Sequence, residues 1–132
     1  MITMKNYKIT NVKHAATGFT LIEFIAYSSS GEVIGVICAN INIDIPCEIK
    51  TFHVEEEWRK KGVGRKLMKA TIKMARKYNQ KKIIVYPLAD ASVNETPLAP
   101  ETLYHIYKRL GYNFVEKNVN IKIYRNKMVI HI

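Results

Sequence analysis

The sequence predicts an α+β fold in one domain over residues 1–132, with a mixed, mostly antiparallel sheet, a central parallel pair and two main helices. Three observations support this fold class. Residues 7–54 form β-branched runs separated by turn signals. Residues 63–78 carry apolar side chains at helical spacing. A compact strand follows that helix, and a helix between two strands implies a parallel crossover.

Four strands are expected first: Tyr7–Val12, Phe19–Tyr27, Val33–Ile43 and Glu48–Val54. All four are rich in β-branched or aromatic residues, which pack well on a pleated sheet. The turn cluster Ser28–Gly31 joins the second and third strands as a hairpin, and Asp44–Pro46 turns the chain again. These segments therefore predict an antiparallel meander.

The helix expected over Val63–Tyr78 has apolar residues on one face and basic residues on the other, and Asn79 and Gln80 end it. The strand Lys82–Tyr86 follows. A second helix starts at Pro100 and ends at Gly111, because proline suits a first helical turn and glycine suits the residue after a last one.

The remaining segments are a long loop and two closing strands. The Pro87–Pro100 loop is irregular and long enough to suggest a function. Tyr112–Glu116 and Ile121–Ile130 are expected to be strands on either side of a turn at Lys117–Asn118.

The charge of the chain is concentrated in one segment. Lys and Arg number 21 against 11 Asp and Glu, a net charge of +10. Residues 59–82 hold eleven of the basic residues and no acidic one, so the rest of the chain carries −1. Such a surplus indicates an anionic partner, either a nucleic acid, an anionic membrane or a phosphorylated ligand. The charges of residues 73–82 form either a solvated face or a site for a further anionic partner.

Other compositional features suggest a cytoplasmic enzyme without a membrane span or a metal. No run approaches the ~18 apolar residues of a spanning helix, and the N-terminal segment has no apolar core of a secretory signal. The two cysteines, Cys38 and Cys47, cannot by themselves build a disulfide framework or a zinc site. We expect both to be buried free thiols.

A motif suited to binding an anion lies at the junction between the fourth strand and the first helix. It reads Arg59-Lys60-Lys61-Gly62-Val63-Gly64. A loop with two glycines brings backbone N–H groups close to an anion, and the helix adds its positive N-terminal end. A pyrophosphate fits such a loop. The motif lacks the Walker A pattern and the three-glycine dinucleotide pattern. The alternative is a helix start that happens to contain glycine.

This stretch resembles the acyl-CoA-binding signature of the GNAT superfamily of N-acetyltransferases, (Q/R)-x-x-G-x-(G/A). Many members precede it with L-x-V-x-P-E-Y-R, and this chain has Phe52–Arg59 there, with Glu56 in place of the common proline. A second family pattern, Leu-Tyr-x-x-x-Gly-Phe, resembles Ile106–Tyr112. The resemblance spans residues 19–130 and implies a GNAT-like fold that binds acetyl-CoA.

The resemblance implies that CoA lies in a V-shaped gap between the central strand and the next parallel strand. The backbones of Phe52 and Val54 would pair with the pantetheine arm, and the Val54 N–H would polarise the thioester carbonyl. The implied cofactor-binding residues are Phe52, His53, Val54, Arg59, Lys60, Lys61, Gly62, Val63, Gly64 and Arg65. Asn94 is a looser match, and a turn asparagine is the alternative there.

The resemblance also assigns an acid and a base for transfer to a primary amine by direct attack in a ternary complex. Tyr107 stands at the family's general acid, with Tyr104 as the fallback. Glu48 matches the glutamate base of the histone-acetylating branch, and strand alternation predicts that it shares a face with Lys50 and Phe52. The alternatives are that Glu48 only pairs with Lys50, or that His53, expected on the opposite face, is the base.

The chain departs from the family in one respect. Members usually have two helices between their first and second strands, whereas only residues 14–19 separate the corresponding strands here. Those helices form one wall of the acceptor site, so the sequence leaves the acceptor open and allows a homodimer that covers the bare sheet. Two other functions stay open: a non-catalytic CoA-binding protein and a basic nucleic-acid-binding module, although no known nucleic-acid-reading motif is present.

Overall fold

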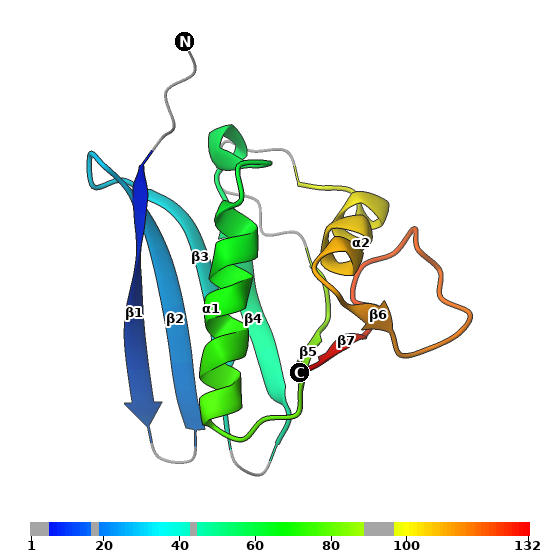
Figure 1. The fold of residues 1–132 in the computed structure, drawn as a ribbon. Coiled ribbons are helices and arrows are strands. Elements are labelled where there is room, and N and C mark those ends of the chain that lie inside the picture. Colours follow the sequence, from blue (N-terminus) through cyan, green and yellow to red (C-terminus); the bar gives the residue numbers. More distant parts are fainter. Residues whose placement is uncertain (1–5, 17–18, 43–44, 89–96) are drawn as a thin grey trace.

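The computed structural model describes residues 6–16, 19–42, 45–88 and 97–132 (Figure 1). Its strands are β1 (Tyr7–Ala16), β2 (Phe19–Ser28), β3 (Val33–Asn40), β4 (Cys47–Val54), β5 (Lys82–Val85), β6 (Asn113–Phe114) and β7 (Met128–His131). Its helices are α1 (Val63–Lys77) and α2 (Pro100–Arg109), with a single 3-10 turn at Glu56–Trp58. The predicted element order is confirmed.

The described strands form one sheet in the order β1-β2-β3-β4-β5-β7-β6. Every neighbouring pair is antiparallel except β4 and β5, which are parallel and are joined through α1. This arrangement confirms the predicted α+β class and its central parallel pair. β1 ends at Ala16 and β2 begins at Phe19, so two residues separate them, too few for the helical pair that the resemblance implies at this point.

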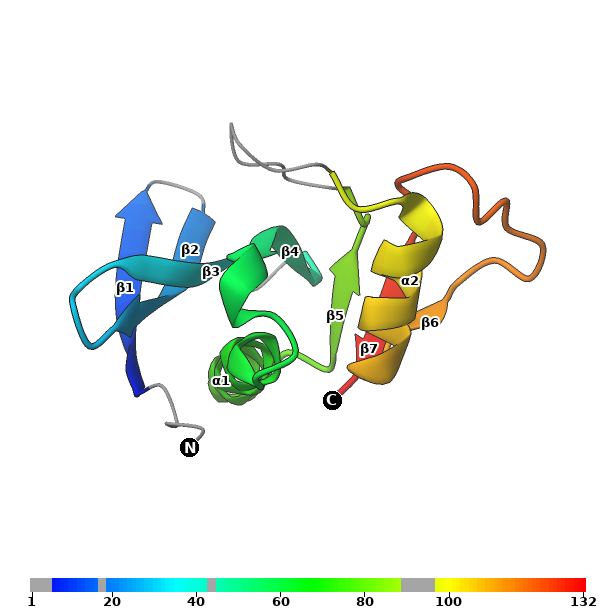
Figure 2. The same cartoon turned by 90° about the horizontal axis from the view of Figure 1, so that it is seen from above.

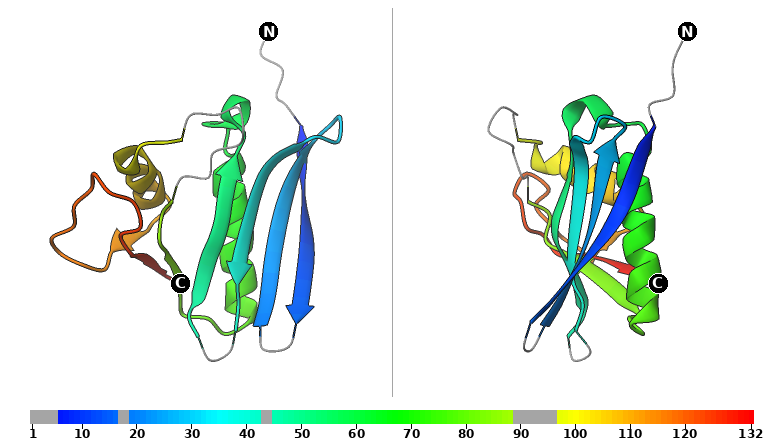
Figure 3. Two further views of the ribbon diagram at one scale, coloured as in Figure 1. Left: turned by 180° about the vertical axis from the view of Figure 1, so that it is seen from behind. Right: turned by 90° about the vertical axis from the view of Figure 1, so that its left-hand side faces the viewer.

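Helix α1 covers one face of β2, β3 and β4 (Figure 2). Its buried residues recur at helical spacing: Val63, Leu67, Met68, Thr71 and Ala75. Gly35 on β3 permits the close approach, because a Cβ there would lie 3.1 Å from Leu67 Cδ1 and 3.3 Å from the His53 carbonyl oxygen. The other face of β1–β4 is covered by no described helix or strand, as the view from behind shows (Figure 3).

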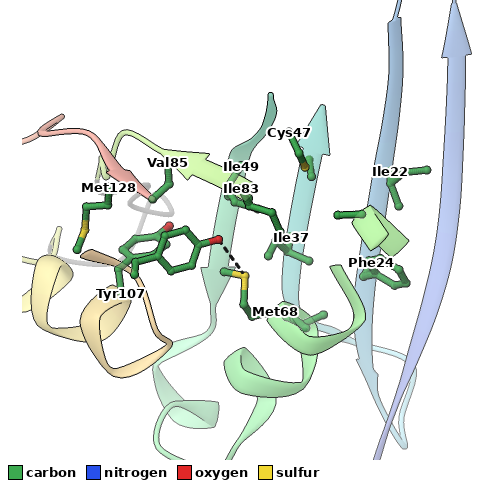
Figure 4. Close-up of a cluster of buried hydrophobic side chains, with 14 of the residues drawn as sticks. Ile22, Phe24, Ile37, Cys47, Ile49, Met68, Ile83, Val85, Tyr107 and Met128 are labelled. Atoms are coloured by element: carbon green, nitrogen blue, oxygen red, sulfur yellow. Dashed lines mark hydrogen bonds between the residues drawn. The ribbon is translucent and has the colours of Figure 1, made fainter. Parts of the chain in front are cut away.

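Helix α2 packs through aromatic side chains at the junction of the two halves of the sheet. The ring of Tyr107 makes edge contacts with Phe52 on β4 and with Tyr112 just after the helix, at centroid distances of 5.9 and 5.4 Å. The Tyr112 hydroxyl donates to the sulfur of Met68 on α1 at 3.4 Å, drawn as a dashed line in Figure 4. These contacts join α1, α2 and the sheet into one core.

A β-bulge interrupts β4 and changes which residues share a face. Cys38 on β3 lies opposite Thr51, whereas the next residue, Ala39, lies opposite Ile49, so Lys50 has no partner across the ladder. Side-chain direction alternates along a strand, and one extra residue therefore reverses it. The buried Cys47 and Ile49 point toward the core, and after the bulge Phe52 and Val54 do so.

Several predicted strand bounds differ from the structure, among them Val33–Ile43, which ends at Asn40, and Tyr112–Glu116, which is a strand only over Asn113–Phe114. Two others differ by four residues or more. β1 continues past Val12 because Lys13–Ala16 pair with β2 in spite of their weak strand propensity. The expected strand Ile121–Ile130 is wrong over residues 121–127, where the chain is irregular. Side-chain hydrogen bonds replace the ladder there: Asn120 Oδ1 accepts from the Lys122 N–H at 3.0 Å.

Gly35→Val should lower the free energy of unfolding by about 1–3 kcal/mol, because the three added carbon atoms would crowd Leu67 and the β4 backbone. Val36→Ile adds one carbon on the uncovered face of the same strand and should change stability by less than about 0.5 kcal/mol. Urea unfolding of both variants measures the difference. Equal effects would contradict the close packing of α1 on β3.

Candidate active site

The site lies where β4 and β5 separate. Only three residue pairs join these strands, from Cys47–Ile83 to Ile49–Val85. Beyond Ile49, β4 continues to Val54 and pairs with β3 alone. A pocket of about 320 Å³ opens at this split, lined by Glu48, Ile49, Lys50, Thr51, Phe52, Val85, Tyr86, Leu88, Tyr107 and Arg125. The pocket therefore lies where the resemblance implies a V-shaped gap.

The free edge of β4 presents backbone groups to this gap. The Glu55 N–H donates to the Ile34 carbonyl on β3 at 2.8 Å. Backbone groups of successive residues in an extended strand point to opposite edges, so the N–H groups of Val54 and Phe52 face the β5 side. The Val54 carbonyl accepts a hydrogen bond from Arg59 Nε at 2.9 Å. Arg59 thus fastens the glycine loop to the end of β4.

The glycine loop adopts a conformation suited to an anion. Lys60 and Gly62 both have positive φ, 61° and 86°, and α1 begins at the next residue, Val63. Alternating left-handed and right-handed residues point successive N–H groups into one concavity, and the helix N-terminus adds its dipole. Lys61 and Arg65 are exposed beside this loop, and Lys61 Nζ lies 5.8 Å from the centre of the Trp58 ring.

Phe52 connects the glycine loop with the pocket. A Cβ at Gly64 would lie 3.3 Å from the end of the Phe52 ring, so only a small residue permits this packing. The other side of the ring contacts Tyr107, and both aromatic residues line the pocket. Phe52 therefore lies between the glycine loop and Tyr107.

The bulge corrects the predicted position of Glu48. Glu48 lies opposite Asn40, and His53 lies opposite Val36, so both project on the face away from α1, whereas Phe52 lies opposite the buried Ile37. Glu48 therefore does not share a face with Phe52, and His53 is not on the opposite face from Glu48. Of the two candidate bases, Glu48 lines the pocket and His53 does not.

Each candidate base has a charged neighbour. Glu48 Oε2 accepts a hydrogen bond from Lys50 Nζ at 2.8 Å, which is the ion pair that the sequence left as an alternative. His53 Nε2 lies 3.5 Å from Glu55 Oε1. A carboxylate has a second oxygen, so the Lys50 contact leaves Glu48 able to accept another proton donor.

The two candidate acids differ in their surroundings. Tyr107 is 4% exposed and lines the pocket. The Tyr104 hydroxyl instead binds the segment before β7: it donates to the Ile123 carbonyl and accepts from the Asn126 N–H at 3.1 Å. Tyr104 therefore holds the loop, and of these two candidate acids Tyr107 lines the pocket.

The sequence missed several lining residues, and one predicted residue lies outside the described chain. Asn94 falls among residues 89–96, which the structure does not describe. Tyr86, Leu88 and Arg125 line the pocket without having been predicted. The polar run from Arg125 to Lys127 interrupts an otherwise alternating segment, and this signal argues against the strand to which Arg125 was assigned.

The part of the chain that the structure describes holds neither a cluster of metal-ligating side chains nor a membrane-spanning helix. No group of three His, Cys, Asp or Glu side chains gathers there as a metal site would require. Neither described helix has the length and apolar character needed to cross a bilayer.

Burial, together with the nearby Glu48 charge, raises the pKa of Cys47 to about 12, and burial together with Glu23 raises the pKa of Cys38.

The raised pKa of Cys47 predicts an inert thiol, because only the thiolate reacts. In a Cys38→Ser variant at pH 8, Cys47 should react with a thiol reagent at least about 100-fold more slowly than in urea-unfolded protein, and the rate should rise with pH. Absorbance of the released thiol dye measures both rates. Similar rates in folded and unfolded protein would show that Cys47 is accessible as a nucleophile.

Solved structures share this fold at low sequence identity. Nourseothricin acetyltransferase superposes with a TM-score of 0.67 at 16% identity, covering 98% of this chain and 99% of that one. An acetyltransferase from Bacillus cereus gives 0.67 at 13% identity, covering 87% and 75%. A GNAT family acetyltransferase from Elizabethkingia anophelis with acetyl-CoA bound gives 0.59 at 18%, covering 94% and 98%.

The sequence itself identifies the family. A search of curated protein sequences gave no match. The family model of the acetyltransferase (GNAT) family, however, matches residues 5–112, which include β1–β5, the glycine loop and α2. With the fold, the split strands and both motifs in place, the chain belongs to the GNAT acetyltransferase family.

Proposed function

We propose that this protein is an acetyl-CoA-dependent N-acetyltransferase that moves the acetyl group to a primary amine by direct attack in a ternary complex. The observation that carries the proposal is the pocket at the β4–β5 split, which Glu48 and Tyr107 both line and which Phe52 connects to the glycine loop. Family membership supports acetyl transfer, and a neighbour with acetyl-CoA bound supports the donor.

The chain offers a partner for each part of the donor. The loop from Lys60 to Arg65 would hold the pyrophosphate through its N–H groups and side-chain charges. The free edge of β4 would bind the pantetheine amides as a neighbouring strand does, since the N–H groups of Phe52 and Val54 face the gap. The Val54 N–H would stabilise negative charge on the thioester oxygen.

Two side chains would move the protons. Glu48, directly or through a water, accepts a proton from the ammonium so that the amine lone pair can attack the thioester carbon. The C–N bond forms and the C–S bond breaks. The leaving thiolate takes a proton from the Tyr107 hydroxyl, and the second proton, which the nitrogen loses as it becomes the amide, returns through solvent to the tyrosinate. His53 remains the second candidate base, but it does not line the pocket that Glu48 lines. No covalent acyl-protein intermediate is needed.

Donor binding should depend on the charges at the start of α1. A Lys61→Gln/Arg65→Gln double variant should weaken acetyl-CoA binding about tenfold or more, because two charge-assisted contacts to phosphate are lost. Lys73→Gln/Lys77→Gln removes the same charge from the far end of the helix and should leave affinity within about twofold, apart from a long-range effect that salt screens. Isothermal titration calorimetry measures both variants.

Absence of acetyl-CoA binding by the unsubstituted protein at millimolar ligand would overturn the proposed function and the non-catalytic CoA-binding alternative together. Equal weakening by the two double variants would instead show that overall charge, and not the glycine loop, attracts the donor.

Tyr107→Phe should lower turnover about 100-fold or more while acetyl-CoA affinity stays nearly constant, because the ring packing is kept and only the proton donor is lost. Tyr78→Phe, at the end of α1 and outside the pocket, is the matched control and should keep full turnover. A thiol-release assay measures turnover. An unchanged rate in Tyr107→Phe would remove Tyr107 from the acid role.

A further inference from the structure

We propose that the acceptor is a small amine that also carries a carboxylate, and that Arg125 binds this carboxylate. This inference rests on the proposed function and specifies its substrate class. It starts from the charges of the described pocket walls, which hold one carboxylate, from Glu48, and two cationic side chains, from Lys50 and Arg125.

The charges in the pocket do not cancel. Lys50 and Glu48 form an ion pair at 2.8 Å and neutralise each other. Among the described residues, no carboxylate lies within ion-pair distance of the Arg125 guanidinium. Among the described residues of the pocket wall, Arg125 therefore brings a positive charge that no ion pair balances. A guanidinium offers parallel N–H donors whose spacing matches the two oxygens of a carboxylate.

The segment that carries Arg125 is fixed to the protein on both sides. The Arg125 N–H donates to the carbonyl of Pro87, a buried residue, at 2.8 Å. Asn126 donates to the hydroxyl of the buried Tyr104, through its N–H at 3.1 Å and its Nδ2 at 3.0 Å. The Tyr124 hydroxyl donates to the Leu98 carbonyl. These bonds tie the segment before β7 to the end of β5 and to α2.

The backbone of Arg125 is held in a conformation that side chains seldom adopt. Its φ is 70°, in the left-handed region that favours glycine, asparagine and aspartate. Such a conformation persists where surrounding contacts determine it, and it is frequent at binding sites. Here the residue in this conformation is an exposed arginine that lines the pocket.

A zwitterionic acceptor complements these charges. Its ammonium group would approach Glu48, which takes the proton, and its carboxylate would approach Arg125. One uncompensated charge matches one carboxylate, whereas a phosphate monoester carries about −1.5 to −2 at neutral pH and would leave a surplus. A second cationic amine, as in a polyamine, would face Arg125 with like charge. The apolar part of the acceptor would contact Tyr86 and Leu88.

The test compares related acceptors that differ only in the carboxylate: leucine, leucinamide and 3-methylbutylamine, together with the corresponding phenylalanine series. In a thiol-release assay, the amino acids should exceed the neutral amines in kcat/KM by about 10- to 100-fold, the usual worth of a charge-assisted hydrogen bond. Arg125→Gln should remove this advantage, mainly through KM, because it lowers kcat/KM for the amino acids far more than for the neutral amines. Comparing variant with wild type for each acceptor cancels the intrinsic basicity of its amine.

Two further variants sharpen the test. Lys122→Gln makes the same charge change in the same segment outside the pocket and should keep the preference for carboxylates. Arg125→Asn suits the left-handed backbone and should behave as Arg125→Gln does, which separates loss of the charge from a disturbed loop.

The outcomes separate this inference from the function on which it rests. Equal kcat/KM for acids and neutral amines, or a preference that survives both Arg125 variants, would overturn the carboxylate assignment and leave acetyl transfer intact. If the protein binds acetyl-CoA but releases no thiol with the leucine or the phenylalanine series, the carboxylate assignment is also overturned, and the non-catalytic alternative is favoured. Failure to bind acetyl-CoA would overturn the proposed function itself.

Discussion

The brevity of the parallel ladder between β4 and β5 is the constraint on which the site depends. Three residue pairs hold the two halves of the sheet together, and beyond Ile49 the strands diverge. A strand that pairs on one edge only must expose backbone N–H and C=O groups on the other, and such groups are costly to bury without partners. Arg59 satisfies the Val54 carbonyl from within the chain. The remaining edge faces a gap that a ligand with its own amides can fill, so the fold supplies binding groups without dedicated side chains.

Helix α1 tolerates its many positive charges because the burial of its apolar face stabilises it more than the repulsion destabilises it. The helix carries six basic residues and no acidic one, and like charges four residues apart, such as Lys69 and Lys73, cost about 0.2–0.5 kcal/mol per pair. Burial of a single side chain such as Leu67 contributes about 1.5–3 kcal/mol, and four other residues of the helix are also buried. Packing therefore outweighs the repulsion. The positive field is then available at the N-terminal turn, where the helix dipole adds to it.

Features governed by local patterns could be predicted from the sequence, and features governed by register could not. The apolar spacing of α1 and the terminating Gly111 (φ 106°) each leave a local signal, and both elements appear where they were expected. The bulge at Lys50 leaves none, because it is defined only by the partner strand, and strict alternation consequently placed Glu48 on the wrong face. Arg125 was missed for a related reason. The β-branched residues around it suggest a strand, but the Lys122 N–H donates to Asn120 Oδ1 and the Asn126 N–H donates to the Tyr104 hydroxyl, in place of ladder bonds.

The single extra residue at Lys50 also has a consequence for chemistry. Before the bulge, Glu48 projects away from α1. After the bulge, Phe52 and Val54 project toward α1 and the glycine loop. In the mechanism that we propose, the donor lies along the α1 side and the acceptor approaches Glu48 from the face that no described helix covers. Two substrates that enter from opposite sides of one strand meet at the split without an intermediate carrier. The buried thiol of Cys47, whose raised pKa of about 12 leaves little thiolate at neutral pH, is unsuited to be such a carrier, which agrees with direct transfer.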